Sequence, residues 1–179
     1  MKPTILAITS LVLLSSFAVA QNQKPEVPTS ATQVLNEWVT NIEQLLVPAA
    51  DAMPEAKYSF APTAGEFKGV RTFGEQVAHV ADANFALANA VLGIKSASSE
   101  KPKTKAEIMA YIKDSFDALD KAAATLTAEN ATEAMDSPFG GKSNPLGLLF
   151  SAATHSRDHY GQLIEYLRMN GIVPPPSRK

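Results

Sequence analysis

The sequence predicts an all-α protein whose four helices form a bundle. Four segments of about 20 residues repeat apolar side chains at helical spacing. Each segment begins at a Ser, Thr or Asn, the residue types that cap helix N-termini. No segment shows the sustained alternation of apolar and polar residues that a half-buried strand needs. Helices of this kind bury their apolar faces against one another, so strands are not required.

The first predicted helix begins at Ser30 and ends before Pro54. Ser30 and Gln33 form the S-x-x-Q pattern of a capping box, in which each residue's side chain bonds the backbone of the other. We expect the apolar stripe that follows to lie in the core. This stripe consists of Leu35, Trp38, Val39, Ile42, Leu45 and Leu46.

The second and third predicted helices each begin with a capping box of threonine and glutamate. In the second helix, Thr72 lies three residues before Glu75, and Gly93 suits the end. The third helix begins at Thr104 and is expected to reach about Leu126.

The fourth predicted helix follows a loop over 130–143 and begins at Asn144, with Pro145 in the first helical position. It is expected to reach Met169, because Asn170 and a glycine follow. The connections between the four helices, about 10 to 19 residues each, are longer than a simple up-and-down bundle needs. We therefore expect at least one of them to cross the length of the bundle.

The first twenty residues have the pattern of an export signal. Lys2 precedes an apolar stretch of about 15 residues, which is short for a membrane span. Residues 18–20 read Ala-Val-Ala, the A-x-A spacing of a cleavage site, and no cysteine follows to carry a lipid anchor. An uncleaved N-terminal anchor is the alternative. We expect a signal peptide over 1–20, a flexible leader over 21–30 and a bundle domain over 31–176, in a periplasmic or secreted protein without a stable membrane anchor.

The composition excludes several classes of function. The chain has no cysteine, so thiolate metal sites, iron–sulfur clusters, disulfides and cysteine nucleophiles are ruled out. With 16 Lys and Arg against 18 Asp and Glu, the net charge is −2, and we expect no nucleic-acid partner. The sequence also lacks a phosphate-binding loop and a dinucleotide fingerprint.

Histidine spacing supplies the candidate site. His155 and His159 are four residues apart in the fourth helix, so both imidazoles share one face and can bind one metal ion. Ser156 stands where the zincin protease motif has glutamate, which excludes that motif. His79, the remaining histidine, lies at the edge of the apolar stripe of the second helix. Three such ligands would leave coordination positions open, as catalytic metal sites do.

Four further side chains are candidates for contacts around the metal or with a substrate. Glu75 and Asp82 lie about one turn to either side of His79 and can hold the second N–H of a ligand imidazole. Gln162 and Tyr166 share the face of the two histidines of the fourth helix and can contact a substrate. The alternatives remain open at this point: solvated carboxylates, a half-buried tyrosine of the bundle, and histidines that bind no metal.

A longer motif surrounds the histidine pair. The last helix reads H-x-x-x-H-x-G-Q-L and ends in N-G-x-x-P-P. In this chain the motif comprises His155, His159, Gly161, Gln162, Leu163, Tyr166, Leu167, Asn170, Gly171, Pro174 and Pro175. The second helix adds the stretch from Phe73 to His79, with Asn84 following. In these features the sequence resembles the DinB family, also described as DinB/YfiT-like metalloenzymes, over about 31–176.

The resemblance implies a four-helix bundle in which His79, His155 and His159 hold a divalent metal ion, usually zinc or nickel, with water or substrate completing the coordination. The family includes thiol-dependent S-transferases and a thiol-dependent isomerase. An oxidising compartment disfavours small-thiol chemistry, so export of this chain argues against carrying the thiol-dependent activity over.

Two functional hypotheses follow, and they differ in whether the site is catalytic. The first is a metal-dependent transferase or hydrolase that acts on a small molecule. The second is an exported, non-catalytic bundle that binds a metal or a small ligand. A purely structural bundle is the third reading, and a homodimer through helix faces is compatible with all three.

Overall fold

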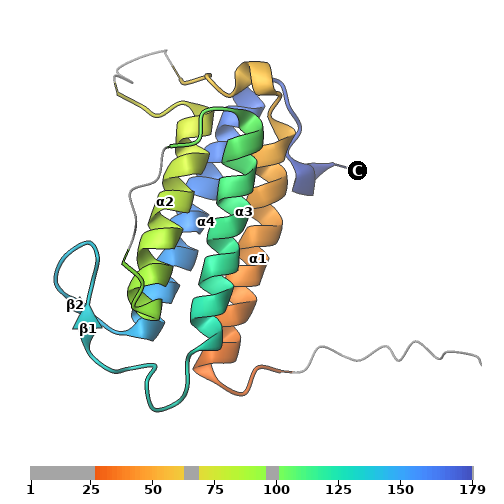
Figure 1. The fold of residues 1–179 in the computed structure, drawn as a ribbon. Coiled ribbons are helices and arrows are strands. Elements are labelled where there is room, and N and C mark those ends of the chain that lie inside the picture. Colours follow the sequence, from red (N-terminus) through yellow and green to blue (C-terminus); the bar gives the residue numbers. More distant parts are fainter. Residues whose placement is uncertain (1–26, 63–68, 96–100, 179) are drawn as a thin grey trace, which may run out of the picture.

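The computed structural model describes residues 27–62, 69–95 and 101–178, and four long helices pack side by side in it (Figure 1). The helices are α1 (Ala31–Ala52), α2 (Phe73–Leu92), α3 (Lys105–Ala124) and α4 (Pro145–Met169). Short 3-10 turns, η1 (Glu55–Lys57) and η2 (Pro175–Ser177), follow α1 and α4. The predicted all-α bundle is confirmed.

The predicted signal peptide over 1–20 and most of the leader over 21–30 lie outside the described residues. Within the described part, no helix combines the length and the apolar character that a membrane span requires.

Local capping explains where the helices begin. Ser30, Thr72 and Thr104 each complete a capping box with the residue three positions later. The Asn144 side chain instead accepts a hydrogen bond from the backbone of Gly147 at 2.8 Å. These bonds satisfy backbone N–H groups that have no partner within the helix. All four starts agree with the sequence prediction, whereas α3 ends at Ala124, slightly before the predicted end.

The helices run in two directions. α1 and α4 run one way, and α2 and α3 run the other way (Figure 1). α2 packs between α3 and α4, while α1 packs against the same two helices on the opposite side of the bundle. Because α2 and α3 are parallel, the chain between them must return along the length of the bundle. This confirms the expectation of a crossing connection, although its middle, 96–100, lies outside the described residues.

The core is a column of aliphatic and aromatic side chains from all four helices. Fully buried members include Val39, Ile42, Leu46, Phe73, Val77, Ile112, Phe116, Leu119, Leu149, Leu163 and Leu167. The prediction that Trp38 belongs to the core is wrong, because 47% of its surface is exposed. The buried stripe of α1 passes through Val39, and adjacent helical residues point about 100° apart. Trp38 therefore lies on the flank of the helix.

A buried polar cluster links α2, α3 and α4. The Asn84 amide donates to the Ser115 hydroxyl at 3.2 Å and accepts from the Ser156 hydroxyl at 3.1 Å. The Ser115 hydroxyl donates in turn to the carbonyl of Ile112 at 2.7 Å. Because polar groups in the core are costly without partners, this cluster fixes how the three helices slide relative to one another. It therefore sets the height at which α4 presents the histidine next to Ser156.

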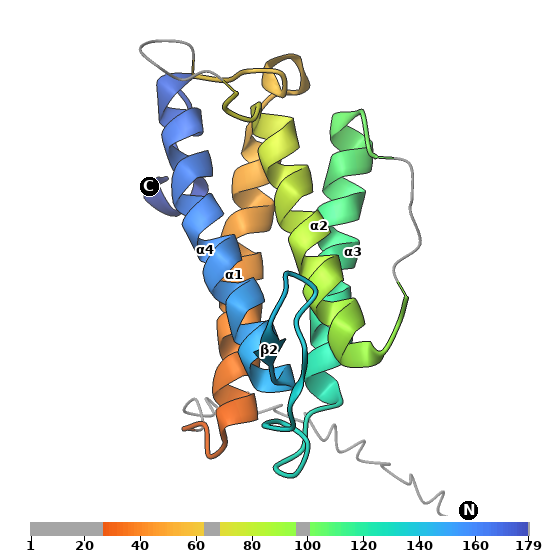
Figure 2. The ribbon, with the colours of Figure 1, turned by 90° about the vertical axis from the view of Figure 1, so that its left-hand side faces the viewer.

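The chain between α3 and α4 contains one difference from the sequence prediction. β1 (Met135–Asp136) pairs antiparallel with β2 (Lys142–Ser143). Each strand has two residues, too few to show an alternating pattern. This hairpin lies at the end of the bundle where α2 ends and α4 begins (Figures 1 and 2).

Candidate metal centre

Three histidines from two helices meet at one point of the bundle. His155 and His159 lie one turn apart on α4, and α2 brings His79 against them. One ligand nitrogen from each residue lies within 4.8 Å of the others. The Nε2 atoms of His155 and His159 are 3.0 Å apart. The structure therefore brings together the three residues that the sequence singled out.

The electrostatic setting keeps these imidazoles neutral. Burial is the largest cause that lowers the pKa of His79, His155 and His159, and for His155 it lowers the pKa to about 4. The next cause is a nearby positive charge: Arg71 for His79, and a neighbouring histidine for the other two. Neutral imidazole is the form that binds metal ions, so no proton has to leave at neutral pH.

The donor set fits a divalent metal ion. Hydrogen bonds within the protein do not satisfy both nitrogens of the His155 ring. Its Nδ1 is buried and has no partner among the described residues. Its Nε2 faces only another imidazole nitrogen. Three neutral nitrogen ligands suit borderline ions such as zinc and nickel, and they leave further coordination positions open.

Gln76 contacts the His159 ring and was not among the residues predicted from the sequence. Its side-chain nitrogen lies 2.6 Å from Nδ1 of His159 and 2.5 Å from the side-chain oxygen of Gln162. The Gln162 amide then donates to Asp158 at 3.0 Å. Gln76 is 3% exposed, so this chain of contacts is shielded from solvent at its inner end.

The Gln76 amide can present either end to His159, because its oxygen and nitrogen are similar in size. With the nitrogen toward the ring, it donates to Nδ1. With the oxygen toward the ring, it accepts the Nδ1 hydrogen, and Nε2 keeps a lone pair for a metal ion; the Gln162 amide must then turn its nitrogen toward Gln76 and give up its bond to Asp158. One feature of the sequence could have identified Gln76: it lies three residues before His79, on the same face of the helix.

Of the other predicted candidates, Gln162 alone joins the histidines through described hydrogen bonds. The exposed Glu75 accepts from the Thr72 backbone at 2.8 Å, and this capping bond lowers its pKa. Asp82 accepts a hydrogen bond from the Tyr111 hydroxyl at 2.8 Å. Both carboxylates therefore have partners away from the imidazole rings.

Tyr166 also bonds away from the rings. It is 7% exposed and donates its hydroxyl hydrogen to the backbone carbonyl of Arg71 at 3.0 Å. Its ring packs edge-on against Phe60, with centroids 5.9 Å apart. Tyr166 thus holds the connection before α2 in place, next to the histidines.

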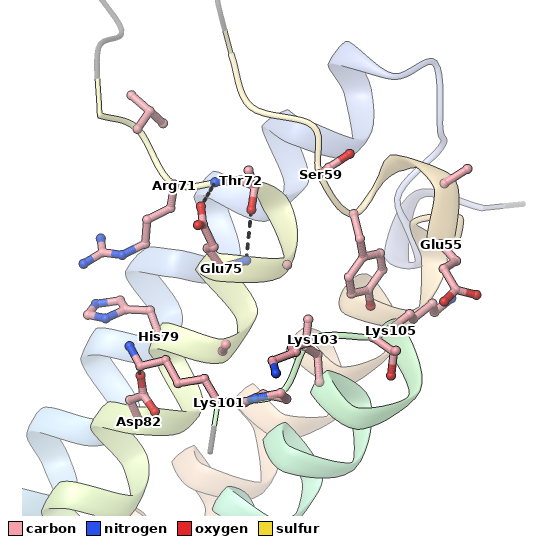
Figure 3. A pocket seen from close by; sticks show the side chains of 18 of the residues that line it. Glu55, Ser59, Arg71, Thr72, Glu75, His79, Asp82, Lys101, Lys103 and Lys105 are labelled. Atoms are coloured by element: carbon pink, nitrogen blue, oxygen red, sulfur yellow. Dashed lines mark hydrogen bonds and ion pairs between the residues drawn. The ribbon is translucent and has the colours of Figure 1, made fainter. Parts of the chain in front are cut away.

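An open cavity of about 1060 Å³ begins at His79 (Figure 3). The segment before α2, the turn η1 and the start of α3 form its walls. Glu75 and Asp82 line it together with Arg71 and Lys101. A small molecule in this cavity would reach the histidine cluster from the His79 side.

Comparison with known proteins agrees with this architecture. The family model of the DinB superfamily matches residues 28–163. A DinB-like protein from Bacillus cereus is 18% identical, with a TM-score of 0.63, over 80% of this chain and 95% of that chain. A DinB-like protein from Bacillus subtilis is 19% identical, with a TM-score of 0.59, over 78% and 92%. A structure from Exiguobacterium sibiricum, described as a DinB family member, is 20% identical, with a TM-score of 0.58, over 81% and 95%. No curated protein matches the sequence.

Proposed function

Because the chain belongs to the DinB superfamily and gathers three neutral histidines beside an open cavity, we propose that it binds one divalent metal ion through His79, His155 and His159. Zinc and nickel are the ions that this donor set favours. The protein is exported, and the site acts on a small molecule as a transferase or a hydrolase.

One observation carries the proposal: three ring nitrogens converge within 4.8 Å in a region where burial keeps them unprotonated. Structural histidines in a core have hydrogen-bond partners for both ring nitrogens. Nδ1 of His155 lacks such a partner and its Nε2 faces another histidine, so a structural role in the bundle explains this residue poorly.

When bound, the ion supplies Lewis acidity to a group at its open coordination positions. The chain's own residues orient and screen the site. Gln76 holds the His159 ring, and the link through Gln162 to Asp158 extends that support to the surface. Leu163, four residues after His159 on α4, is fully buried in the core.

The first test is metal content. The protein is purified without a polyhistidine tag, and bound metal is counted by elemental mass spectrometry. We expect about one zinc or nickel ion per chain, lost in His79→Ala and in His155→Ala. Glu165→Gln, at an exposed position of the same helix as His155, serves as the control and should keep the ion. Circular dichroism checks that each variant is folded.

The proposal fails if the wild-type protein contains no metal and does not bind added Zn²⁺ or Ni²⁺ at micromolar concentration. It also fails if both histidine variants keep the ion.

The second candidate function is a non-catalytic metal- or ligand-binding protein. It is favoured by the fact that Glu75 and Asp82 are held by Thr72 and Tyr111, so neither carboxylate is oriented as a base. Cobalt substitution separates the two functions. A cobalt spectrum that changes with pH and with added small anions supports an open, catalytic site, whereas an unresponsive spectrum supports simple binding.

A further inference from the structure

The cavity beside the histidines is lined by an excess of basic side chains. Arg71, Lys101, Lys103 and Lys105 all contribute to its walls. Lys105 is occupied by other contacts, because its ammonium pairs with Asp51 at 3.1 Å and donates to two backbone carbonyls.

Three acidic residues line the cavity: Glu55 lies on η1, across the cavity from Arg71 (Figure 3), and the other two are occupied locally. Glu75 is held by the Thr72 cap, and Asp82 accepts from Tyr111 and pairs with Lys101 at 3.9 Å. By contrast, none of the ion pairs between described residues involves the guanidinium of Arg71. Within the part of the chain that the structure describes, Arg71 is thus the cavity cation next to His79 that no carboxylate pairs with.

Arg71 lies next to the metal ligands. Figure 3 shows its guanidinium beside the imidazole of His79, with both side chains on the same side of α2. Arg71 and His79 both line the cavity, so a molecule bound there can contact both residues. The Tyr166 hydroxyl donates to the backbone carbonyl of Arg71, which holds the Arg71 backbone in place.

We propose that Arg71 is the anion-binding residue of this site, and that the small molecule bound in the cavity carries a carboxylate or a phosphate group. This inference rests on the proposed metal site and deepens it. A guanidinium presents two parallel N–H groups, which match the two oxygens of such an anion. An anion between Arg71 and the metal ion would also offset the repulsion between these two positive charges.

The same geometry disfavours cationic ligands at the end of the cavity next to His79. A positively charged molecule would meet Arg71 and the metal ion together, with no unpaired carboxylate of Glu75 or Asp82 to balance it. The site should therefore prefer anionic to cationic ligands, and Arg71 should determine this preference.

The test compares wild-type protein with Arg71→Gln in two titrations. The first measures Zn²⁺ affinity in an anion-poor buffer, by competition with a chromophoric chelator. The second measures binding of inorganic phosphate, and separately of succinate, to the zinc-loaded protein by calorimetry. Arg157→Gln is the matched control, because Arg157 is an exposed arginine whose guanidinium donates to Asn41 of α1, away from the cavity.

We expect Arg71→Gln to bind Zn²⁺ as tightly as the wild-type protein or more tightly, since a repelling charge is removed. Its affinity for phosphate or succinate should fall about tenfold or more. Arg71→Lys should recover part of this loss, because it keeps the charge but not the paired donors. Which of the two probes binds distinguishes a phosphate ligand from a carboxylate ligand.

The inference is overturned if the zinc-loaded wild-type protein binds neither anion, or if Arg71→Gln binds them unchanged. Failure of the metal site itself has a separate signature, because the wild-type protein then shows no Zn²⁺ binding in the first titration.

Discussion

Replacing Gln76 by leucine should weaken metal binding while the bundle stays folded. The substitution removes the side chain that contacts Nδ1 of His159 at 2.6 Å and leaves the side-chain oxygen of Gln162 without that donor. The His159 ring can then rotate, and its tautomer is no longer fixed. Loss of such a supporting contact typically costs about 10- to 100-fold in metal affinity.

The expected magnitude agrees with the structure. A 10- to 100-fold loss corresponds to about 1.4–2.8 kcal/mol. Removing one partner of a buried hydrogen bond, so that the other is left unsatisfied, costs about 1–3 kcal/mol. His159 is 8% exposed, so water replaces the lost partner only in part.

The assay is a competition titration of Zn²⁺ against a chromophoric chelator, with urea unfolding of the metal-free protein beside it. Gln76→Glu retains an oxygen that can accept the Nδ1 hydrogen and should bind Zn²⁺ more tightly than Gln76→Leu. Gln162→Leu, which removes only the outer link, should have the smaller effect. Equal Zn²⁺ affinity in wild-type protein and Gln76→Leu would refute the reasoning.

Two further predictions concern stability. Asn84→Leu should lower the free energy of unfolding by about 1–3 kcal/mol, because the hydroxyls of Ser115 and Ser156 lose a buried partner, and urea unfolding at neutral pH measures this. Unchanged stability would show that the cluster does not hold the helices. Stability should also fall in acid through Glu107, whose folded pKa is lowered by the Thr104 capping bonds, so its contribution is present above the unfolded pKa of 4.5 and is lost as pH falls through the folded value. Glu107→Gln should make the urea midpoint less sensitive to pH between 5 and about 3, and an unchanged pH dependence would contradict this.

The helices were predictable because the signals that start them are local. A capping box such as Thr72 with Glu75 acts within one turn, so it can be recognised without knowing the rest of the fold. The position of Trp38 was not predictable in the same way. An apolar stripe is wider than the strip that a bundle buries, and the partner helices decide which edge stays exposed.

The same distinction between local signals and tertiary contacts applies to the site. The spacing of His155 and His159 is a property of one helix, so their convergence followed from sequence alone. The roles of Gln76 and Arg71 depend on contacts between α2, α4 and the segment before α2. Gln76 shares a helix face with His79, but its partner His159 lies on another helix, and Arg71 lies before α2, outside any periodic pattern, so tertiary structure was needed to assign both roles.

Charge balance connects the two proposals. Three neutral imidazoles contribute no negative charge, so a divalent ion bound to them would keep its full charge beside the Arg71 guanidinium. The nearby carboxylates are already held by other groups: Glu75 by Thr72, and Asp82 by Tyr111 and a lysine. The protein therefore leaves the compensating negative charge to the ligand. A site of this kind binds its metal ion and its anionic ligand cooperatively, so each should raise the affinity for the other by the same factor.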